Sequence, residues 1–244
     1  MKNYLIRSLY KIKSPVWFAD RTAEGDLYDW YMKMHDISLK SFEKHLQGDW
    51  EFIFFNKEVE NIQEVFKDHF FEIYDIWKQG DTNILYCGPD NLMIKPTNFF
   101  NNYEDFMMFN YTDPKSSQED NHYDVQHPDF FNADVRYYPS TMSQEIWDIG
   151  LEMAENWDFK CWNTEQIILN KMLWDQPNRT LSNTLDPKIA YQGHQLFLEE
   201  WEQRKSWSNR WNGVELKDAH IIHLHGSRNA PRKYALMKEL EQFV

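Results

Sequence analysis

Residues 88–91 (Gly-Pro-Asp-Asn) place one carboxylate, Asp90, among residue types that favour turns. The apolar runs 84–86 and 92–94 on either side predict a buried strand that ends at a kink and resumes beyond it. Ligands often bind where strands of open α/β sheets end, so Asp90 is a candidate to bind Mg²⁺ or Mn²⁺, which in turn holds a diphosphate. An ordinary turn explains these residues equally well.

Residues 220–226 (His-Ile-Ile-His-Leu-His-Gly) contain a second group with chemical potential. In a strand, residues two apart share a face, so His223 and His225 would point the same way. A lone histidine is most often structural, but two on one face beside Gly226 favour a ligand site. If His223 lies next to Asp90, a divalent cation gains an imidazole ligand and neutralising a diphosphate becomes feasible.

Further polar residues suit phosphate or sugar recognition. Arg228 and Arg232 follow the histidines and could pair with phosphate oxygens, although solvated charge at the start of a helix is the simpler interpretation. Asn132 lies in an expected strand, and Glu165 and Gln166 lie at an expected helix start. Glu165 also suits the helix dipole, so its position has a structural explanation as well as a functional one.

Composition narrows the class of protein. The chain of 244 residues has 26 basic and 39 acidic residues, a net charge of −13, which opposes binding to nucleic acid. Hydrophobic residues make up 42%, so a folded core is expected. Its 2 cysteines are too few for a disulfide framework. No stretch is apolar enough for a transmembrane segment or signal peptide, and we expect a cytoplasmic protein.

The elements that must position these residues alternate between strand and helix in the first half of the chain. A β-rich run at 50–55 suggests a strand covered on both faces. Alternation of this kind predicts an α/β fold with a mostly parallel sheet flanked by helices. The expected strands are residues 5–10, 50–55, 84–86 and 106–109, and the expected helices are residues 28–46 and 62–77.

The second half is less regular. Polar residues 113–129 predict a long loop, plausible as a lid. Ser140 or Thr141 would cap the helix that follows the next strand. We expect one domain over residues 1–244, with a nucleotide-binding half (1–110) and an acceptor half (111–244). The expected strands are residues 130–139, 189–191 and 219–224, and the expected helices are residues 142–157, 164–174, 197–205 and 232–243.

Four of these segments, in this order, resemble the GT-A nucleotide-sugar glycosyltransferases, especially the glycogenin and lipopolysaccharide galactosyltransferase branch. Residues 84–96 are similar to the strand pattern Leu-Tyr-Leu-Asp-x-Asp-x-Leu-x-x-Lys-Pro, and residues 131–134 to Phe-Asn-x-Gly. The pair 165–166 is similar to a helix-leading Asp-Gln, and 223–226 to His-x-x-Gly. The resemblance implies a Rossmann-like GT-A fold.

It also implies an activity: transfer of a sugar from a nucleoside-diphosphate sugar to an acceptor hydroxyl, with retention of configuration. Asp90 and His223 would hold Mn²⁺ or Mg²⁺, while Gly88 stands where the family has its first aspartate. Asp134 replaces a glycine and would crowd the site or add an acid. The residues implied in orienting the sugar are Asn132, Glu165 and Gln166. Those implied in binding the diphosphate are Gly226 and Arg228. Leu9 and Tyr10 are expected to contact the nucleotide base because of their position in the first strand alone.

Two other functions fit the same residues. Loss of the first aspartate favours a protein of this fold that binds nucleotide sugars, or acts as a scaffold, with weakened catalysis. A metal-dependent phosphate hydrolase would also use aspartate and histidine, but the chain has no second clustered carboxylate motif.

Overall fold

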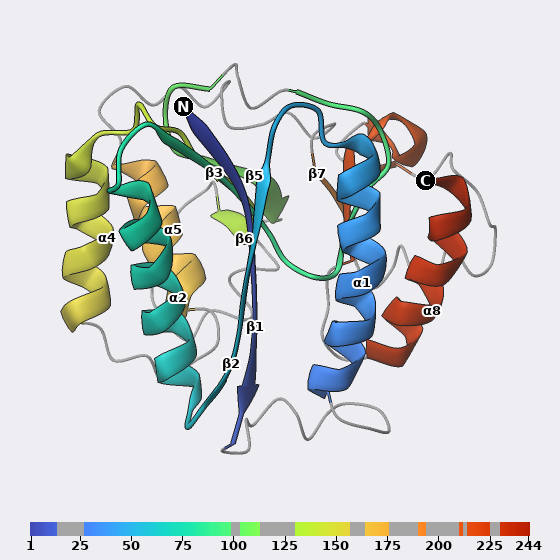
Figure 1. The fold of residues 1–244 in the computed structure, drawn as a ribbon, viewed down its shortest axis with the longest axis horizontal. Helices are drawn as coiled ribbons and strands as arrows, with labels where there is room; N and C mark the ends of the chain where they lie inside the picture. Colours follow the sequence, from blue (N-terminus) through green and yellow to red (C-terminus); the bar gives the residue numbers. More distant parts are fainter. Residues whose placement is uncertain are drawn as a thin grey trace.

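A five-stranded mixed sheet forms the centre of the molecule, which we describe from a computed structural model (Figure 1). Its strand order is β2-β1-β3-β6-β5. β2, β1 and β3 are parallel, and β6 pairs antiparallel with both β3 and β5, so in this sheet β6 alone is reversed. The mostly parallel α/β sheet predicted from the sequence is confirmed. The strands are β1 (Lys2–Ile12), β2 (Glu51–Val59), β3 (Thr82–Cys87), β5 (Met107–Thr112) and β6 (Phe130–Tyr138).

The structure describes residues 1–13, 27–98, 103–112, 130–156, 164–175, 190–193, 210–211, 214–224 and 230–244. The predicted lid at 113–129 and the predicted helix at 197–205 lie outside these residues. The division into nucleotide-binding and acceptor halves stays a prediction. None of the helices within the described ranges combines the length and apolar character that crossing a membrane requires.

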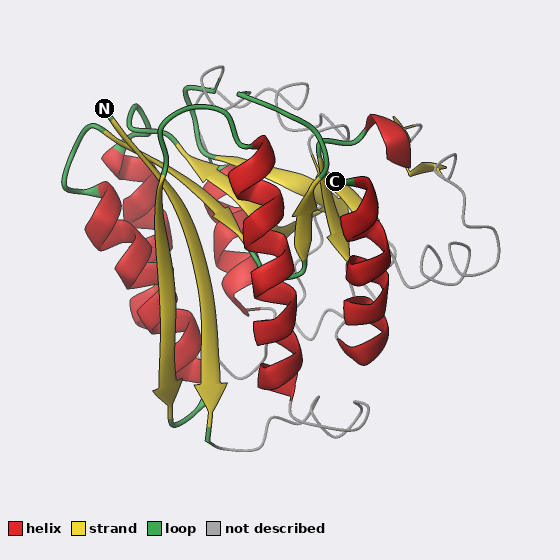
Figure 2. Ribbon diagram, turned by 45° about the vertical axis from the view of Figure 1, so that its right-hand side comes forward, coloured by secondary structure: helices red, strands yellow, loops and turns green. Residues whose placement is uncertain are grey.

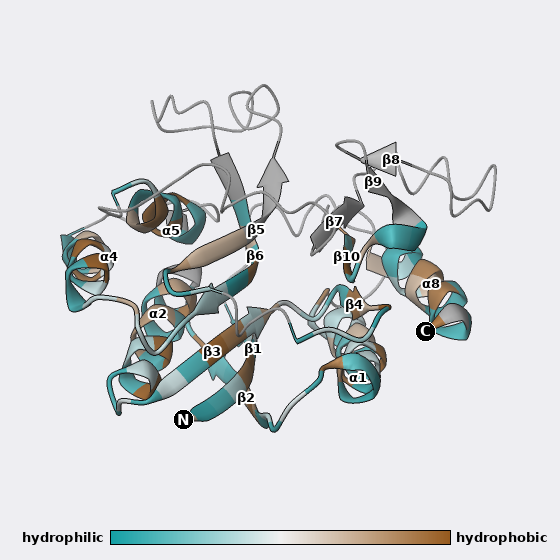
Figure 3. Cartoon of the chain, turned by 90° about the horizontal axis from the view of Figure 1, so that it is seen from above, coloured by the Kyte–Doolittle hydropathy of each residue, from teal (hydrophilic) through white to brown (hydrophobic). Residues whose placement is uncertain are grey.

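Helices cover both faces of the sheet (Figures 1 and 3). α2 (Ile62–Trp77), α4 (Gln144–Asn156) and α5 (Thr164–Trp174) lie on one face, and α1 (Leu27–His45) lies on the other, with α8 (Ala230–Leu240) packed against α1. The parallel order of β1, β2 and β3 follows from the connections, because α1 and α2 are long enough to carry the chain back to the same end of the sheet.

A second, three-stranded sheet lies beside α8, in the order β4-β10-β7 (Figure 3). Its strands are β4 (Asn91–Met93), β10 (Ile221–Leu224) and β7 (Ala190–Gly193), with a separate hairpin of β8 (Arg210–Trp211) and β9 (Val214–Glu215). The prediction of one strand that resumes beyond a kink is therefore wrong. Pro89 cannot donate a ladder hydrogen bond, and β4 instead pairs antiparallel with β10.

The prediction that the strand at 50–55 is covered on both faces is also wrong. β2 is the edge strand next to β1 (Figure 2), and Phe52 is 39% exposed. Ile53 and Phe55 are only partly buried against the core, and the half-buried Phe54 ring stacks on His35 of α1 with centroids 4.0 Å apart. A run of apolar letters therefore indicated a strand here but not its burial.

α4 and α5 approach each other closely at Gly150, where a side chain would collide. A Cβ placed there would lie 2.5 Å from both Met172 Sδ and the Phe70 ring. The predicted cap of α4 at Ser140 or Thr141 is wrong, because the helix begins at Gln144 and Thr141 Oγ1 donates to the Glu104 carbonyl instead.

Candidate functional site

The turn after β3 presents Asp90 at the carboxyl end of a central parallel strand. Gly88 N donates to the Asp134 carbonyl oxygen at 3.0 Å, which extends the pairing of β3 with β6. The Asn91 side-chain amide donates to the Gly88 carbonyl at 3.0 Å, and Ser38 Oγ donates to the Asn91 carbonyl. These bonds hold the turn in one conformation and leave Asp90 only 5% exposed.

The second sheet brings His223 to Asp90. β10 pairs with β4 so that His223 lies opposite Asn91, and Leu224 N donates to the Asp90 carbonyl at 3.0 Å. His223 Nε2 consequently lies 3.7 Å from Asp90 Oδ1. The sequence-based expectation that these two residues meet is confirmed in geometry.

Asp134 on β6 completes the group. Its Oδ2 lies 2.7 Å from His223 Nε2, and the ligand atoms of Asp90, Asp134 and His223 all lie within 4.8 Å of one another. Asp134 lies in a bulge of β6, since Met108 pairs with Arg136 while Asn110 pairs with Asn132. From the sequence, Asp134 was expected either to crowd the site or to add an acidic group. In the structure it adds a carboxylate next to His223.

Lys233, on α8, was not singled out from the sequence. Its Nζ donates to Asp90 Oδ2 at 2.5 Å and to the Tyr31 hydroxyl at 3.1 Å, and the residue is 1% exposed. A signal was available, because Lys233 is spaced four and seven positions from the buried residues Met237 and Leu240, on one helical face. We call Asp90, Asp134, His223 and Lys233 the Asp90 cluster.

Charge dominates the Asp90 cluster. Burial lowers the pKa of His223, but the negative charges of Asp134 and Asp90 outweigh it and the pKa is raised above its ordinary value. Burial likewise opposes the charge on Lys233, yet Asp90 raises the pKa of its ammonium group. With neutral histidine, the cluster carries one more negative charge than positive, which favours a cation.

The donor set fits a hard or borderline divalent cation. Two carboxylates and an imidazole are ligands that Mn²⁺ accepts, and Mg²⁺ prefers the carboxylates. Asn91 Oδ1 is a further buried oxygen in this turn and has no hydrogen-bond partner among the described residues. The cluster is therefore compatible with binding a divalent metal ion.

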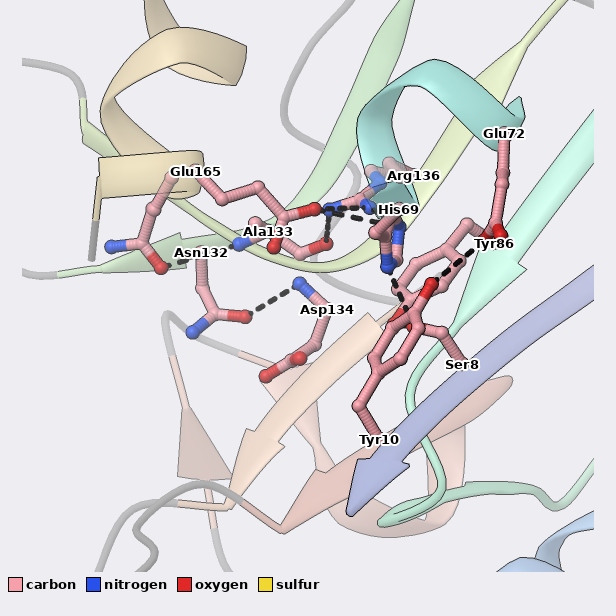
Figure 4. A network of polar contacts seen from close by, with 11 residues as sticks. Ser8, Tyr10, His69, Glu72, Tyr86, Asn132, Ala133, Asp134, Arg136 and Glu165 are labelled. Carbon is pink, nitrogen blue, oxygen red and sulfur yellow. Dashed lines mark hydrogen bonds and ion pairs between the residues drawn. The ribbon is translucent and has the colours of Figure 1, made fainter. Parts of the chain in front are cut away.

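Beside it lies a second buried group around Arg136 (Figure 4). Arg136 Nη2 donates to Glu165 Oε1 at 2.6 Å and to His69 Nε2, and the guanidinium lies 4.0 Å from the Tyr86 ring centre. Ser8 Oγ lies 2.6 Å from His69 Nδ1. We call Arg136, Glu165, His69, Ser8 and Tyr86 the Arg136 cluster.

The hydrogen bonds of this cluster fix the state of His69. A guanidinium can only donate, so His69 Nε2 accepts from Arg136 and Nδ1 carries the proton that it donates to Ser8. Burial lowers the pKa of His69 to about 4, and the positive charge of Arg136 adds to the effect while Glu165 opposes it. His69 is thus a neutral connector at physiological pH.

Two of the three predicted sugar-orienting residues contact the backbone of β6 next to Asp134, and the third belongs to the Arg136 cluster. Asn132 Oδ1 accepts from Asp134 N at 2.9 Å, and Gln166 Oε1 accepts from Ala133 N at 3.4 Å (Figure 4). Glu165, by contrast, has its carboxylate paired with Arg136. The structure therefore brings Asn132 and Gln166 next to Asp134 and gives Glu165 a cationic partner that the sequence did not suggest.

The remaining predicted residues divide into two groups. Tyr10 is buried and its hydroxyl donates to Glu72 Oε2 at 2.8 Å, while Leu9 is half-buried in the same strand. Gly226 and Arg228 lie outside the described residues, as does His225.

Comparison with known proteins bears on the fold. No family model matches the chain, and no curated protein matches it. Among solved structures, a glycosyltransferase involved in the glycosylation of the major capsid of PBCV-1 is similar over 98% of this chain and 100% of its own, with a TM-score of 0.51 and 12% identity. The apo-form glycosyltransferase GlyE of Streptococcus pneumoniae TIGR4 aligns over 93% of this chain and 55% of its own, with a TM-score of 0.47 and 15% identity. The first likeness shows that the chain has a glycosyltransferase fold.

Proposed function

We propose that this protein is a glycosyltransferase that moves a sugar from a nucleoside-diphosphate sugar to an acceptor hydroxyl, with the help of a divalent cation. The observation that carries the proposal is the buried group of Asp90, Asp134 and His223, placed at the carboxyl end of β3 in a chain with a glycosyltransferase fold. Ligands of open α/β sheets bind at this end of the strands.

Asp90, Asp134 and His223 would hold Mn²⁺ or Mg²⁺. Such an ion supplies neutralisation of the negative charge that develops on the departing diphosphate. The chain has a net charge of −13, so an anionic donor needs a local positive centre of this kind. Lys233 keeps Asp90 Oδ2 engaged, which leaves Asp90 Oδ1 directed toward His223.

Donor binding would use the residues around this centre. Asn132 and Gln166 are held against β6 next to Asp134 and are placed to orient the sugar. Glu165 would act through Arg136 as a positioning residue, because its carboxylate is already paired. By resemblance, Gly226 and Arg228 would contact the diphosphate. By their position in the first strand, Leu9 and Tyr10 would contact the base. Retention of configuration follows from the same resemblance.

One observation favours the alternative of a protein that binds nucleotide sugars without efficient turnover. Lys233 Nζ lies 2.5 Å from Asp90 Oδ2 and His223 Nε2 lies 2.7 Å from Asp134 Oδ2, so both carboxylates have a partner without a metal ion. A site that needs no ion to fold can lose catalysis and keep its structure.

A panel of nucleoside-diphosphate sugars with Mn²⁺ or Mg²⁺ separates these functions when the release of free nucleoside diphosphate is measured. For a transferase we expect release that stops with EDTA and falls at least ~100-fold in Asp90→Asn. Asp75→Asn is the matched control, because Asp75 is exposed on α2 and, within the part of the chain that the structure describes, forms an ion pair only with Lys78, three positions along.

Three results would count against the proposal. Donor binding without release in any condition supports the scaffold alternative. Cleavage of simple phosphate esters with equal efficiency supports a hydrolase. If no nucleotide sugar changes the melting temperature or is cleaved, the proposed function is wrong.

A further inference from the structure

We propose that Gly88 and Asp134 form a reciprocal pair. Asp134 on β6 supplies a metal-binding carboxylate in place of one at position 88 in the turn after β3, and Gly88, which has no side chain, leaves room for the Asp134 side chain. This inference rests on the proposed function only in taking a divalent cation as the ligand. It predicts that the carboxylate can be moved from one strand to the other.

The strand pairing places the two positions together. Cys87 lies opposite Val135 in the antiparallel pair of β3 and β6, and the next hydrogen bond runs from Gly88 N to the Asp134 carbonyl at 3.0 Å. Residues directly opposite each other in an antiparallel pair have Cβ atoms about 5 Å apart. Side chains at positions 88 and 134 would therefore reach the same volume.

A side chain at position 88 would fit tightly against those already present. A Cβ at position 88 would lie 3.2 Å from Asp134 Oδ1, 3.3 Å from Asp90 Oδ1 and 3.3 Å from the Asn91 amide nitrogen. Two of these neighbours are carboxylate oxygens, so a second acid here would meet repulsion as well as crowding. The absence of a side chain at Gly88 thus leaves Asp134 room to lie next to Asp90 and His223 without displacing a neighbour.

The charges of the cluster make Asp134 the ligand on which cation binding depends most. Asp90 is neutralised by Lys233, whose Nζ lies 2.5 Å from its Oδ2. Without Asp134, the group would contain that ion pair and one imidazole, with no net negative charge. Asp134 is also the most accessible of the three, with 38% of its side chain exposed against 7% for Asp90.

The test measures Mn²⁺ binding by electron paramagnetic resonance and by calorimetry, without donor, in wild type and four variants. Asp134→Asn keeps the shape and removes the charge, and we expect Mn²⁺ affinity to fall at least ~10-fold. The Mn²⁺ affinity of Asp134→Gly should fall as far. The double variant with Gly88→Asp and Asp134→Gly should recover most of the lost Mn²⁺ affinity. Asp75→Asn, exposed on α2, should bind as wild type does.

Thermal unfolding of every variant shows whether it is folded, and the near-isosteric Asp134→Asn keeps the test informative if a glycine variant is not. The inference is overturned if Asp134→Asn binds Mn²⁺ as tightly as wild type, or if the double variant binds no better than Asp134→Gly. It is also overturned if wild type binds neither Mn²⁺ nor Mg²⁺. Should the predicted binding pattern appear without any release of nucleoside diphosphate, the reciprocal pair stands and the proposed transferase fails.

Discussion

The Asp90 cluster and the Arg136 cluster are both buried, both contain a histidine beside acidic and basic groups, and both include a residue of β6. They differ in how completely the charged groups of each cluster pair with one another. Arg136 satisfies Glu165 and His69 at once, and its histidine is neutral. In the Asp90 cluster, two acids converge on His223, its pKa is raised, and Asp134 is partly exposed.

The difference indicates how one strand serves two purposes. Polar groups that satisfy one another completely give rigidity and a unique conformation. Groups with surplus negative charge near solvent give a place for a cation. Arg136 and Asp134 are two positions apart on β6. The rigid Arg136 cluster therefore adjoins the Asp90 cluster, which we propose binds the ion.

The largest effect is expected from breaking the balanced cluster. Arg136→Met should lower the free energy of unfolding by about 3–5 kcal/mol, because it leaves Glu165 without its buried partner and removes the cation over Tyr86. Urea unfolding measures this. Tighter Mn²⁺ binding or unchanged stability in Arg136→Met would contradict the division into a structural Arg136 cluster and a cation-binding Asp90 cluster.

Acid should weaken the same cluster through His69. Its pKa is 6.5 in the unfolded chain and about 4 in the fold, so its contribution is complete above pH 6.5, declines as pH falls below that value and is lost near pH 4. The loss amounts to about 3 kcal/mol.

Urea unfolding at pH 7 and pH 5 tests this, with His69→Gln as the comparison. Glutamine can accept from Arg136 and donate to Ser8 but does not titrate. His35, whose pKa burial also lowers to about 4, contributes in the same direction in both proteins. Equal pH dependence in wild type and His69→Gln would contradict the assignment.

A smaller effect that depends on metal is expected from Lys233→Met. Loss of the ammonium group should cost about 2 kcal/mol, below the usual range for a broken buried pair, because Asp90 keeps the nearby His223. Added Mn²⁺ should then raise the melting temperature of the variant more than that of wild type, since the freed acid attracts the cation.

Lys238→Met is the control on the same helix, where an exposed lysine pairs with Glu241 at 3.1 Å. Its stability and its response to Mn²⁺ should match wild type. Equal shifts with Mn²⁺ in wild type and Lys233→Met would show that Lys233 does not compete with a cation.

The smallest effect is expected at an exposed group of ion pairs. Like the two clusters it combines basic and acidic side chains, but it is not buried. Lys57 lies 2.7 Å from both Asp68 and Glu72 on the surface. Lys57→Met should change the free energy of unfolding by less than ~1 kcal/mol, because solvent screens such pairs. A loss comparable to that of Arg136→Met would mean that burial is not what separates these groups.

Local patterns were sufficient for the sheet and its helices. The apolar stripe of residues 62–77 predicted α2, and the alternation of strands with helices predicted the parallel order of β2, β1 and β3. Local patterns failed where burial depends on distant partners. β2 has the apolar sequence of an inner strand but is an edge strand. β4 belongs to a different sheet from β3 and pairs with β10.

The site was predicted in part for the same reason. Resemblance paired Asp90 with His223, but Lys233 lies 143 positions from Asp90 and a lysine on a helix ordinarily faces solvent. Asp134 was seen as a departure from a pattern, and its value as a ligand depends on the bulge in β6 and on the empty space at Gly88. Neither feature can be inferred from adjacent residues.

The junction of the two sheets has one more consequence. Asp90 follows β3, Asp134 lies on β6 of the main sheet, and His223 lies on β10 of the second sheet. A cation held by all three would join the sheets, and local opening of β10 would then require a metal–ligand bond to break. Amide hydrogen exchange in β10 should slow when Mn²⁺ binds, while exchange in the outer strand β2 stays unchanged.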